Sequence, residues 1–324
     1  MIVKVKTNTN IALVKYWGKK NSKLKTPLNN SISMTLDKLF TITSAEVIDS
    51  KKDEVFFNNI QKEDDKSKKI VDFIDIFRNN FDKKDKKIRI ITENNFPTAS
   101  GLASSASGFS ALSVAVANVL NLNLTDKELS IYSRLGSGSA CRSIFGGFVE
   151  WNKGEVEDGS DSYATQIKDE NYWDLNMIVC IVDDIKKDKS STDGMKETVE
   201  TCPFYPAWLE TIEKDLQEVR NGILEKDLEK VGQTMEHNCL KMHSTMFTTK
   251  PSIIYWKPKT LEIIHKVREL RNEGLNCYFT IDAGANVKIL CQKNDSNKIM
   301  NFIDNILPKD KIIVCSAGSG YNFI

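Results

Sequence analysis

A serine- and alanine-rich segment at residues 97–107 constrains the fold more than any other part of this chain. Its sequence, PTASGLASSAS, follows the strand-like alternation of Lys87–Thr92. It precedes apolar residues three and four apart, which predict a helix from about Ser105 to Leu120. Small residues let the backbone approach a ligand closely, and the free amides at the start of a helix bind anions. The segment therefore predicts a phosphate-binding strand–loop–helix unit, although small residues packed tightly against a sheet are an alternative explanation.

Hydroxyl groups in the same segment add hydrogen-bonding capacity. Ser104, Ser105 and Ser107 can bond to phosphate or provide a magnesium ligand. The segment is not a Walker A loop, because no Gly-Lys-Ser or Gly-Lys-Thr closes it.

Two further segments are rich in groups that bind anions. The segment NIALVKYWGK at residues 10–19 has Lys15 and Lys19 as point charges and a tyrosine as phenolic donor. In GSGSACRSIFGG, residues 136–147, Arg142 can hold a carboxylate or phosphate through two parallel hydrogen bonds. The ordinary explanations are a solvated surface charge for each lysine and a simple loop for the second segment.

Two more segments follow predicted strands. The apolar run Met177–Val182 predicts a buried strand, and the lysines and hydroxyls of KKDKSSTDGM, residues 186–195, come shortly after it. Asp282 lies in a predicted tight turn between the strands Cys277–Ile281 and Asn286–Cys291, where an Asx turn would also account for it. These four segments, together with residues 97–107, indicate a site for an anionic small molecule.

Charge and composition argue against several other classes of protein. The 45 basic and 44 acidic side chains leave a formal charge of +1, unlike an electrostatic nucleic-acid binder. No run approaches the roughly 18 apolar residues of a membrane span, and the first ten residues lack a signal-peptide core. Seven cysteines without paired spacing indicate reduced thiols. We therefore expect a soluble, cytoplasmic protein that binds neither nucleic acid nor membrane.

The order of predicted elements along the 324 residues indicates an α+β protein of two domains. Thr125 and Glu128 form a capping-box pattern that starts a second helix, and Gly274 ends a later one. The other expected elements are strands at residues 1–6, 40–47 and 311–315, and helices at residues 207–222, 224–243, 260–272 and 297–306. We place the domain boundary near Asp183, which divides the chain into residues 1–183 and 184–324.

The segments together resemble the diphosphomevalonate decarboxylase family, the decarboxylating branch of the GHMP kinase superfamily. The motifs that carry the resemblance, in the family's order, are KYWGK, NNFPTASGLASSASGF, GSGSACRSIFGGFVEW, KKDKSSTDGM and FTIDAGANV. They extend from Asn10 to Gly320, and their combination is highly specific, whereas the phosphate loop alone indicates only the superfamily. The family commonly has proline at the position of Ala285, and the loss of that proline would loosen the turn that carries Asp282.

The resemblance implies a GHMP kinase fold, with a ribosomal S5 domain 2-like N-terminal domain and a ferredoxin-like C-terminal domain. It implies ATP-dependent decarboxylation of (R)-5-diphosphomevalonate to isopentenyl diphosphate, with ADP, phosphate and CO2 as the other products. This step belongs to the mevalonate pathway of isoprenoid biosynthesis. ATP and Mg²⁺ are the implied cofactors, and the implied assembly is a homodimer.

The family's functional residues carry over wherever its motifs match this chain. The resemblance implies that Asp282 orients the tertiary hydroxyl of the substrate or accepts its proton, that Lys187 reaches the ATP phosphates, and that Arg142 holds the substrate carboxylate. The residues implied to bind substrate are Asn10, which orients Arg142, and Tyr16, Trp17, Gly18, Lys19, Arg78, Ser137, Gly138, Ser139, Ala140, Cys141, Arg142, Ser191 and Thr192. Those implied to bind ATP are Gly101, Leu102, Ala103, Ser104, Ser105, Ala106 and Ser107, with Ser105 as the candidate Mg²⁺ ligand. Residues 186–195 are expected to form a loop that closes over ATP.

Alternative functions stay open at this point. A kinase of the same superfamily would phosphorylate without decarboxylating, and a related enzyme would use mevalonate with a single phosphate. A non-catalytic scaffold would be expected to have lost Asp282 or the phosphate loop, and both are present. His237, Cys239 and His243 suggest zinc, but residues six apart on their predicted helix do not share a face closely.

Overall fold

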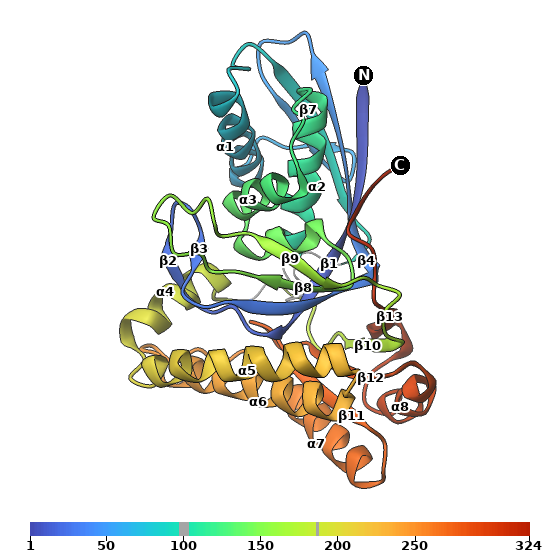
Figure 1. Ribbon diagram of the computed structural model, residues 1–324. Helices are drawn as coiled ribbons and strands as arrows, with labels where there is room; N and C mark the ends of the chain where they lie inside the picture. Colours follow the sequence, from blue (N-terminus) through green and yellow to red (C-terminus); the bar gives the residue numbers. More distant parts are fainter. Residues whose placement is uncertain (97–103, 186–187) are drawn as a thin grey trace.

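The computed structural model describes residues 1–96, 104–185 and 188–324, and its first part is built on an eight-stranded sheet (Figure 1). The main strand order is β14-β1-β4-β7-β5-β6, with β8 beside β4 and β9 beside β8. Only the β5–β7 pair is parallel among the described pairs. The elements are β1 (Ile2–Val14), β2 (Lys19–Asn21), β3 (Thr26–Pro27), β4 (Ser31–Ile48), β5 (Glu54–Phe57), β6 (Ile60–Gln61), α1 (Asp65–Asn80), β7 (Lys87–Asn94), α2 (Ser104–Val119), α3 (Asp126–Gly136), the 3-10 helix η1 (Gly138–Ile144), β8 (Phe148–Trp151) and β9 (Ala164–Lys168).

Helix α2 covers one face of this sheet, and its composition explains how closely it packs. It contacts β1 and β4, and small residues such as Ala111 and Ala115 are fully buried in the contact. The second half of β4 alternates buried and partly exposed residues, as expected of a strand with one covered face. The first six residues of β4 are all buried, and α5 contacts this strand as well. The predicted strands at residues 1–6, 40–47 and 87–92 and the predicted helix near Ser105 are confirmed.

The second part of the chain is a four-stranded antiparallel sheet with helices packed on it (Figure 1). Its strand order is β11-β12-β10-β13, and α6 and α7 contact β11 and β12. The elements are β10 (Leu175–Cys180), α4 (Ser191–Thr201), α5 (Tyr205–Glu225), α6 (Leu228–Phe247), α7 (Pro258–Asn272), β11 (Cys277–Ile281), β12 (Val287–Gln292), the 3-10 helix η2 (Lys293–Asp295), α8 (Ser296–Ile303), the 3-10 helix η3 (Lys309–Lys311), β13 (Ile312–Ser316) and β14 (Tyr321–Phe323). No helix in the described ranges is long and apolar enough to cross a membrane.

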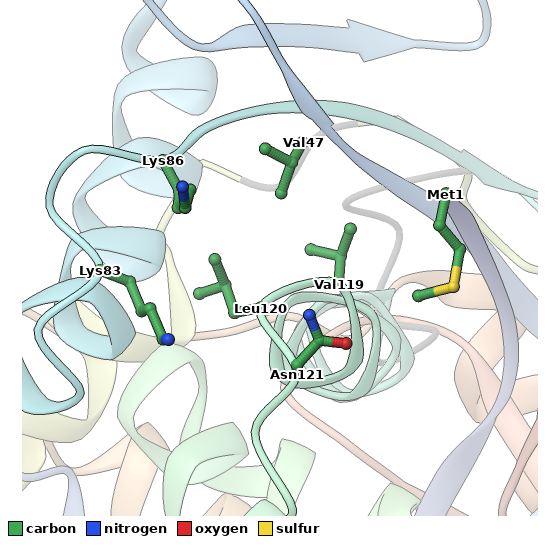
Figure 2. A pocket seen from close by; sticks show the side chains of 7 residues that line it. All are labelled: Met1, Val47, Lys83, Lys86, Val119, Leu120 and Asn121. Atoms are coloured by element: carbon green, nitrogen blue, oxygen red, sulfur yellow. The ribbon is translucent and has the colours of Figure 1, made fainter.

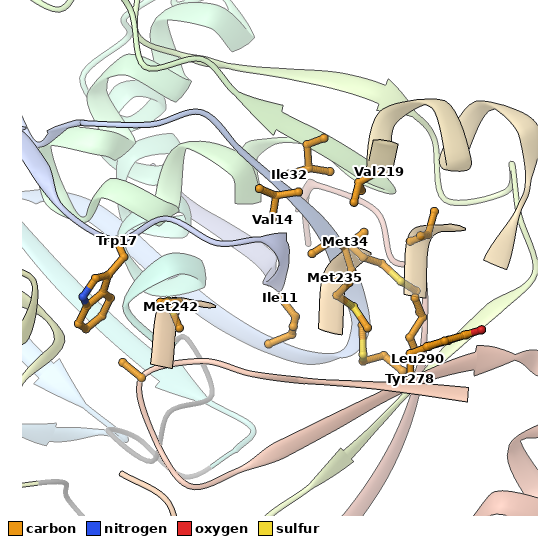
Figure 3. Packing of buried hydrophobic residues seen from close by; sticks show 14 of the residues in the cluster. Ile11, Val14, Trp17, Ile32, Met34, Val219, Met235, Met242, Tyr278 and Leu290 are labelled. Atoms are coloured by element: carbon orange, nitrogen blue, oxygen red, sulfur yellow. The ribbon is translucent and has the colours of Figure 1, made fainter. Parts of the chain in front are cut away.

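One hydrophobic core joins the two sheets. Ile11 and Met34 of the first sheet lie in the same buried cluster as Met235 of α6 and Leu290 of the second sheet, as Figure 3 shows. Burial of apolar area contributes about 25 cal/mol per Å², so this shared cluster stabilises the arrangement of the sheets as well as each sheet itself. Packing in this shared cluster therefore determines how the two sheets lie relative to each other.

The helix predictions for the second part are confirmed, and local signals explain them. The amphipathic stretches correspond to α5, α6, α7 and α8, and Gly274 follows α7 with φ 94°. The capping box of Thr125 and Glu128 is present at the start of α3. Part of the expected loop at residues 186–195 is helical instead, because Ser190 caps α4 by accepting a hydrogen bond from the Asp193 amide.

Two strand pairings cross the predicted domain division. The division after Asp183 groups β10 with the first sheet, whereas β10 pairs with β12 and β13 of the second. The last strand, β14, returns to the first sheet and pairs with β1. The division at residue 183 stays a prediction, and these pairings favour a boundary ahead of β10.

Candidate active site

The turn between β11 and β12 places the carboxylate of Asp282 between two buried lysines. Lys15, directly after β1, brings its ammonium to 2.7 Å from Oδ1, and the ammonium of Lys288 on β12 lies 3.2 Å from Oδ2. Both lysine side chains are 1% exposed, and that of Asp282 is 24% exposed. Burial by itself would raise the pKa of Asp282, but the two ammonium charges outweigh it and hold that pKa well below its usual range. Asp282 is therefore an ionised carboxylate that retains access to solvent.

Hydrogen bonds to the backbone hold the Asp282 turn in place. The amide of Gly284 donates to the Asp282 carbonyl (2.7 Å), and the hydroxyl of Thr260 donates to the carbonyl of Ala285 (2.7 Å). The Asn286 side chain accepts from the amides of Val182 and Asp183, which ties the turn to the end of β10. These contacts anchor the turn at the position where the family commonly has proline.

Helix α6 supports both sides of the lysine–aspartate pair. The side-chain oxygen of Asn238 accepts a hydrogen bond of 2.8 Å from the amide of Lys15. The thiol of the next residue, Cys239, and the ring of His243 further along α6 contact the backbone of Ile281, the residue before Asp282. Cys239 and His243 thus have packing and hydrogen-bonding partners of their own. No group of three His, Cys, Asp or Glu side chains within the described residues is arranged to hold a metal.

Arg142 of η1 carries a buried positive charge. Its Nε donates to the side-chain oxygen of Asn10 (3.1 Å), and one terminal nitrogen donates to the hydroxyl of Ser31. Asn10 also donates to the hydroxyl of Ser143 and the carbonyl of Ser139, so its amide is fixed in the orientation that accepts from Arg142. No carboxylate of the described residues lies within ion-pair distance of Arg142. Burial lowers the pKa of Arg142, and an anionic ligand would compensate its charge.

The neighbouring segment of η1 packs closely against Tyr16. A Cβ at Gly138 would lie 3.0 Å from the Tyr16 hydroxyl, so only glycine fits there without displacement. That hydroxyl is buried, and no hydrogen-bond partner for it exists among the described residues. An unpartnered buried hydroxyl is costly, and a hydrogen bond to a polar ligand would offset this cost. Of the other predicted residues, Ala140 and Cys141 are fully buried, and Ser137 and Ser139 are partly exposed.

Residues 17–19 connect this segment to the start of α4. The Trp17 carbonyl accepts a hydrogen bond of 2.7 Å from the hydroxyl of Tyr205, and Gly18 adopts φ 111°, which side chains rarely allow. The Lys19 ammonium lies 3.4 Å from the hydroxyl of Thr192, in the first turn of α4 beside Ser191. Burial lowers the pKa of Lys19, although Asp193 partly opposes the shift.

The predicted nucleotide residues fall into three groups. Gly101, Leu102, Ala103 and Lys187 lie outside the described residues. Ser104 and Ser105 are accessible at the start of α2, and Ser105 lies 3.2 Å from the Ser137 hydroxyl, so α2 and η1 meet there. Ala106 is fully buried, and the buried hydroxyl of Ser107 bonds to Thr41 (2.7 Å) on β4.

Comparisons with known proteins identify the family of this chain. A model described as "Diphosphomevalonate decarboxylase-like N-terminal domain" matches residues 7–164, and one described as "Mevalonate 5-diphosphate decarboxylase C-terminal domain" matches residues 177–320. The diphosphomevalonate decarboxylase of Saccharomyces cerevisiae is 38% identical over 312 residues, which cover 91% of this chain and 78% of that protein. The chain belongs to the diphosphomevalonate decarboxylase family.

Solved structures of the family match the whole chain. The mevalonate diphosphate decarboxylase from Enterococcus faecalis is 40% identical, with a TM-score of 0.92 over 100% of this chain and 99% of that one. A structure described as MDDEF in complex with MVAPP, AMPPCP and magnesium is 41% identical, with a TM-score of 0.93 and the same coverage. These likenesses confirm the expected α+β GHMP kinase fold.

Arg78, which the family resemblance suggested as a substrate residue, is not part of this site. Its guanidinium is buried in α1 and pairs with Asp53 and Asp75. The carboxylate of Asp53 also accepts from the amide of Ile88 on β7, so the ion pair ties α1 to the first sheet. The structure therefore favours a structural role for Arg78 over substrate binding, since both of its terminal nitrogens donate to carboxylates within the N-terminal part.

We expect Arg78→Met to destabilise the protein without a selective effect on substrate binding. Removing one partner of a buried ion pair leaves an uncompensated carboxylate, which costs about 3–5 kcal/mol. Urea unfolding would measure the loss of stability, and steady-state kinetics of the folded fraction should give an unchanged KM for the substrate. A KM raised tenfold or more with unchanged stability would restore Arg78 as a substrate residue.

Lys15 and Lys288 were absent from the sequence-based list of site residues. Lys15 belongs to the KYWGK motif and was noted there only as a point charge. Lys288 could have been found from sequence, because it is the one charged residue within the apolar run Val287–Cys291 of β12. A lysine buried in such a run needs a charged partner. Asn238 had no such signal, because its role depends on the backbone of Lys15, 223 residues away in sequence.

A cavity of about 280 Å³ at the other end of α2 does not belong to this family's site. It is lined by Val119, Leu120 and Asn121, after the last turn of α2, together with Met1 and Val47 (Figure 2). The 16 residues of α2 span roughly 24 Å at 1.5 Å per residue, which separates this cavity from Ser104 and Ser105.

Proposed function

We propose that the chain catalyses the ATP-dependent decarboxylation of (R)-5-diphosphomevalonate to isopentenyl diphosphate, with ADP, phosphate and CO2 as products. The observation that carries the proposal is the ionised Asp282 carboxylate held by two lysines, within range of the charge of Arg142. Membership in the diphosphomevalonate decarboxylase family supports the reaction, and the complex with MVAPP, AMPPCP and magnesium supports ATP and Mg²⁺ as cofactors.

The reaction requires an acid group beside a tertiary alcohol, and Asp282 supplies it. The hydroxyl on carbon 3 is a poor leaving group, so the terminal phosphoryl group of ATP is first transferred to its oxygen. Asp282 orients this hydroxyl and accepts its proton as the oxygen–phosphorus bond forms. The phosphate then departs with the electron pair of its carbon–oxygen bond. The accepted proton passes from Asp282 to the departing phosphate, so Asp282 is ionised again and its charge stabilises the electron-deficient carbon. The bond to the carboxylate breaks, its electrons form the double bond, and CO2 leaves.

Substrate binding is assigned to the two segments that surround Arg142 and Tyr16. Arg142, oriented by Asn10, holds the substrate carboxylate and keeps it ionised until it leaves. The diphosphate is assigned to the segment of Tyr16, Trp17, Gly18 and Lys19 and to Ser191 and Thr192 at the start of α4, a helix end that favours negative charge. The segment of Ser137, Gly138, Ser139, Ala140 and Cys141 forms the facing wall.

The nucleotide is assigned to the start of α2. Ser104 and Ser105 are accessible there, and the first-turn amides of the helix suit phosphate oxygens. Ser105 is proposed as the Mg²⁺ ligand, and this ion when bound with ATP offsets the charge of the phosphates. Gly101, Leu102, Ala103, Ala106 and Ser107 are retained as neighbours of the nucleotide, and Lys187 is proposed to reach the transferred phosphoryl group.

ATP-dependent release of CO2 tests the proposal and separates it from its alternatives. We expect stoichiometric CO2, ADP and phosphate with 5-diphosphomevalonate, and at least about 100-fold lower kcat/KM with 5-phosphomevalonate, because Lys19 and Thr192 would lose their anionic partner. ADP formation without CO2 would indicate a superfamily kinase. Preference for the singly phosphorylated substrate would indicate the related enzyme, and no turnover of either would indicate a scaffold.

The domain division, the assembly and the compartment are further proposals. We propose a boundary between β9 and β10, ahead of Asp183, which the sheet pairings and the two family models at residues 7–164 and 177–320 support. We also propose a homodimer, to be tested by light scattering in solution. A cytoplasmic location is supported by the seven cysteines, all of them buried and free.

A further inference from the structure

Lys288 is a buried lysine in the middle of an apolar strand. It lies between Val287 and Ile289 on β12, and 1% of its side chain is exposed. Its ammonium lies 3.2 Å from Oδ2 of Asp282 and donates to the carbonyl of Asn286, also at 3.2 Å. Taking an ammonium out of water costs several kcal/mol unless a charge partner compensates it. Burying Lys288 therefore costs the protein stability, which suggests that this lysine contributes to function.

A structural ion pair would need only one cation, and Asp282 already has one in Lys15. With Lys288 the three side chains carry an excess positive charge, and Arg142 adds to the positive charge around Asp282. An anionic substrate raises the pKa of a carboxylate beside it, and nearby cations lower that pKa. Burial would raise the pKa of Asp282, and Lys15 and Lys288 together reverse the shift.

The two lysines reach Asp282 from different parts of the protein. Lys15 follows β1 of the first sheet, whereas Lys288 and Asp282 both belong to the β11–β12 hairpin of the second sheet. The contact with Lys288 therefore does not depend on how the two sheets sit relative to each other. Lys15 holds one oxygen across the core, and Lys288 holds the other within the hairpin, so the plane of the carboxylate is defined by both.

We propose that Lys288 is a positioning residue for the decarboxylation: its ammonium holds Oδ2 and thereby sets the orientation of the Asp282 carboxylate toward the substrate hydroxyl. The inference rests on the proposed function. Because Lys288 is buried, it acts through Asp282 and does not touch the substrate itself.

Replacing Lys288 with methionine tests the proposal, because methionine removes the charge and keeps an unbranched side chain. We expect kcat for CO2 release to fall about 30-fold, since a misplaced catalytic group costs up to roughly 10²-fold in rate. The KM values for diphosphomevalonate and ATP should change less than about threefold, because neither ligand contacts Lys288. Lys230→Met, which removes an exposed lysine paired with Glu225, is the matched control and should leave kcat unchanged.

A double-mutant cycle with Asp282→Asn shows whether Lys288 acts through Asp282. In the Asp282→Asn background, Lys288→Met should lower kcat less than twofold further, and it should raise the melting temperature because it removes a buried ammonium that has lost its counter-charge. An equal loss of kcat in both backgrounds would overturn the proposal, as would a Lys288→Met enzyme within twofold of wild-type kcat.

Two further measurements keep these outcomes distinct. If Lys288→Met alone is not recovered folded, Lys288→Gln replaces it, with the same expected fall in kcat. The double variant with Asp282→Asn then provides the comparison of melting temperature. Wild-type CO2 release is measured first, because its absence would remove the proposed function. Normal wild-type release with an unaffected Lys288→Met removes only the role of Lys288.

Discussion

Replacing Asp282 with asparagine should lower kcat for CO2 release by about 10³-fold, the range expected when a catalytic base is lost. Asparagine is close to aspartate in shape but cannot accept the hydroxyl proton or stabilise positive charge on carbon 3. KM for diphosphomevalonate should stay within a few-fold of the wild-type value, because the proposed binding contacts lie elsewhere. Steady-state release of CO2 and ADP together would show that both steps are lost.

The same substitution should also reduce stability, because Lys15 and Lys288 would lose their shared counter-charge. Leaving buried charges unpaired costs about 3–5 kcal/mol, which denaturant unfolding would detect. Asp282→Ala serves as the matched comparison, since it also removes the hydrogen-bonding group. Turnover in either variant within tenfold of wild type would overturn the catalytic assignment of Asp282.

Arg142→Lys should lower kcat/KM for diphosphomevalonate by about 10²-fold or more, although the positive charge is kept. The guanidinium is held by Asn10 and Ser31 in a fixed plane, from which two parallel bonds to a carboxylate are available. A lysine ammonium is a single point charge, so it attracts the carboxylate without fixing its direction. Initial-rate kinetics with the substrate varied would separate KM from kcat.

Asn10→Ala provides the control for this interpretation. It leaves the charge of Arg142 intact and removes only the side chain that orients it, so we expect a smaller loss of about tenfold, mainly in KM. Full decarboxylation with normal substrate affinity in Arg142→Lys would show that orientation by the guanidinium is the wrong account.

Much of the fold was predictable from local patterns. The helices α5, α6 and α7 follow from apolar residues three and four apart, and the ends of α3 and α7 from a capping box and a glycine. The pairing of β14 with β1 was not predictable, because the two strands lie at opposite ends of the chain. Helix α4 was missed because its start, SSTDG, is composed of residues that favour turns as well as helix caps.

Most of the proposed catalytic and binding residues could be predicted from the sequence, but the residues that they contact could not. Asp282, Arg142 and Asn10 stand in distinctive motifs, so sequence alone selects them. Sequence alone does not show whether the partner of Arg78 is a ligand or a carboxylate of the chain, and the structure places Asp53 beside it.

Sequence by itself determined the residue types, the helical periodicity and the family, since each depends on order along the chain. Only the tertiary structure decided that Lys15 and Lys288 share one carboxylate and that Asn238 holds the backbone of Lys15. The physical reason is that a buried charge is stable only beside a partner, and the packing of distant segments selects that partner.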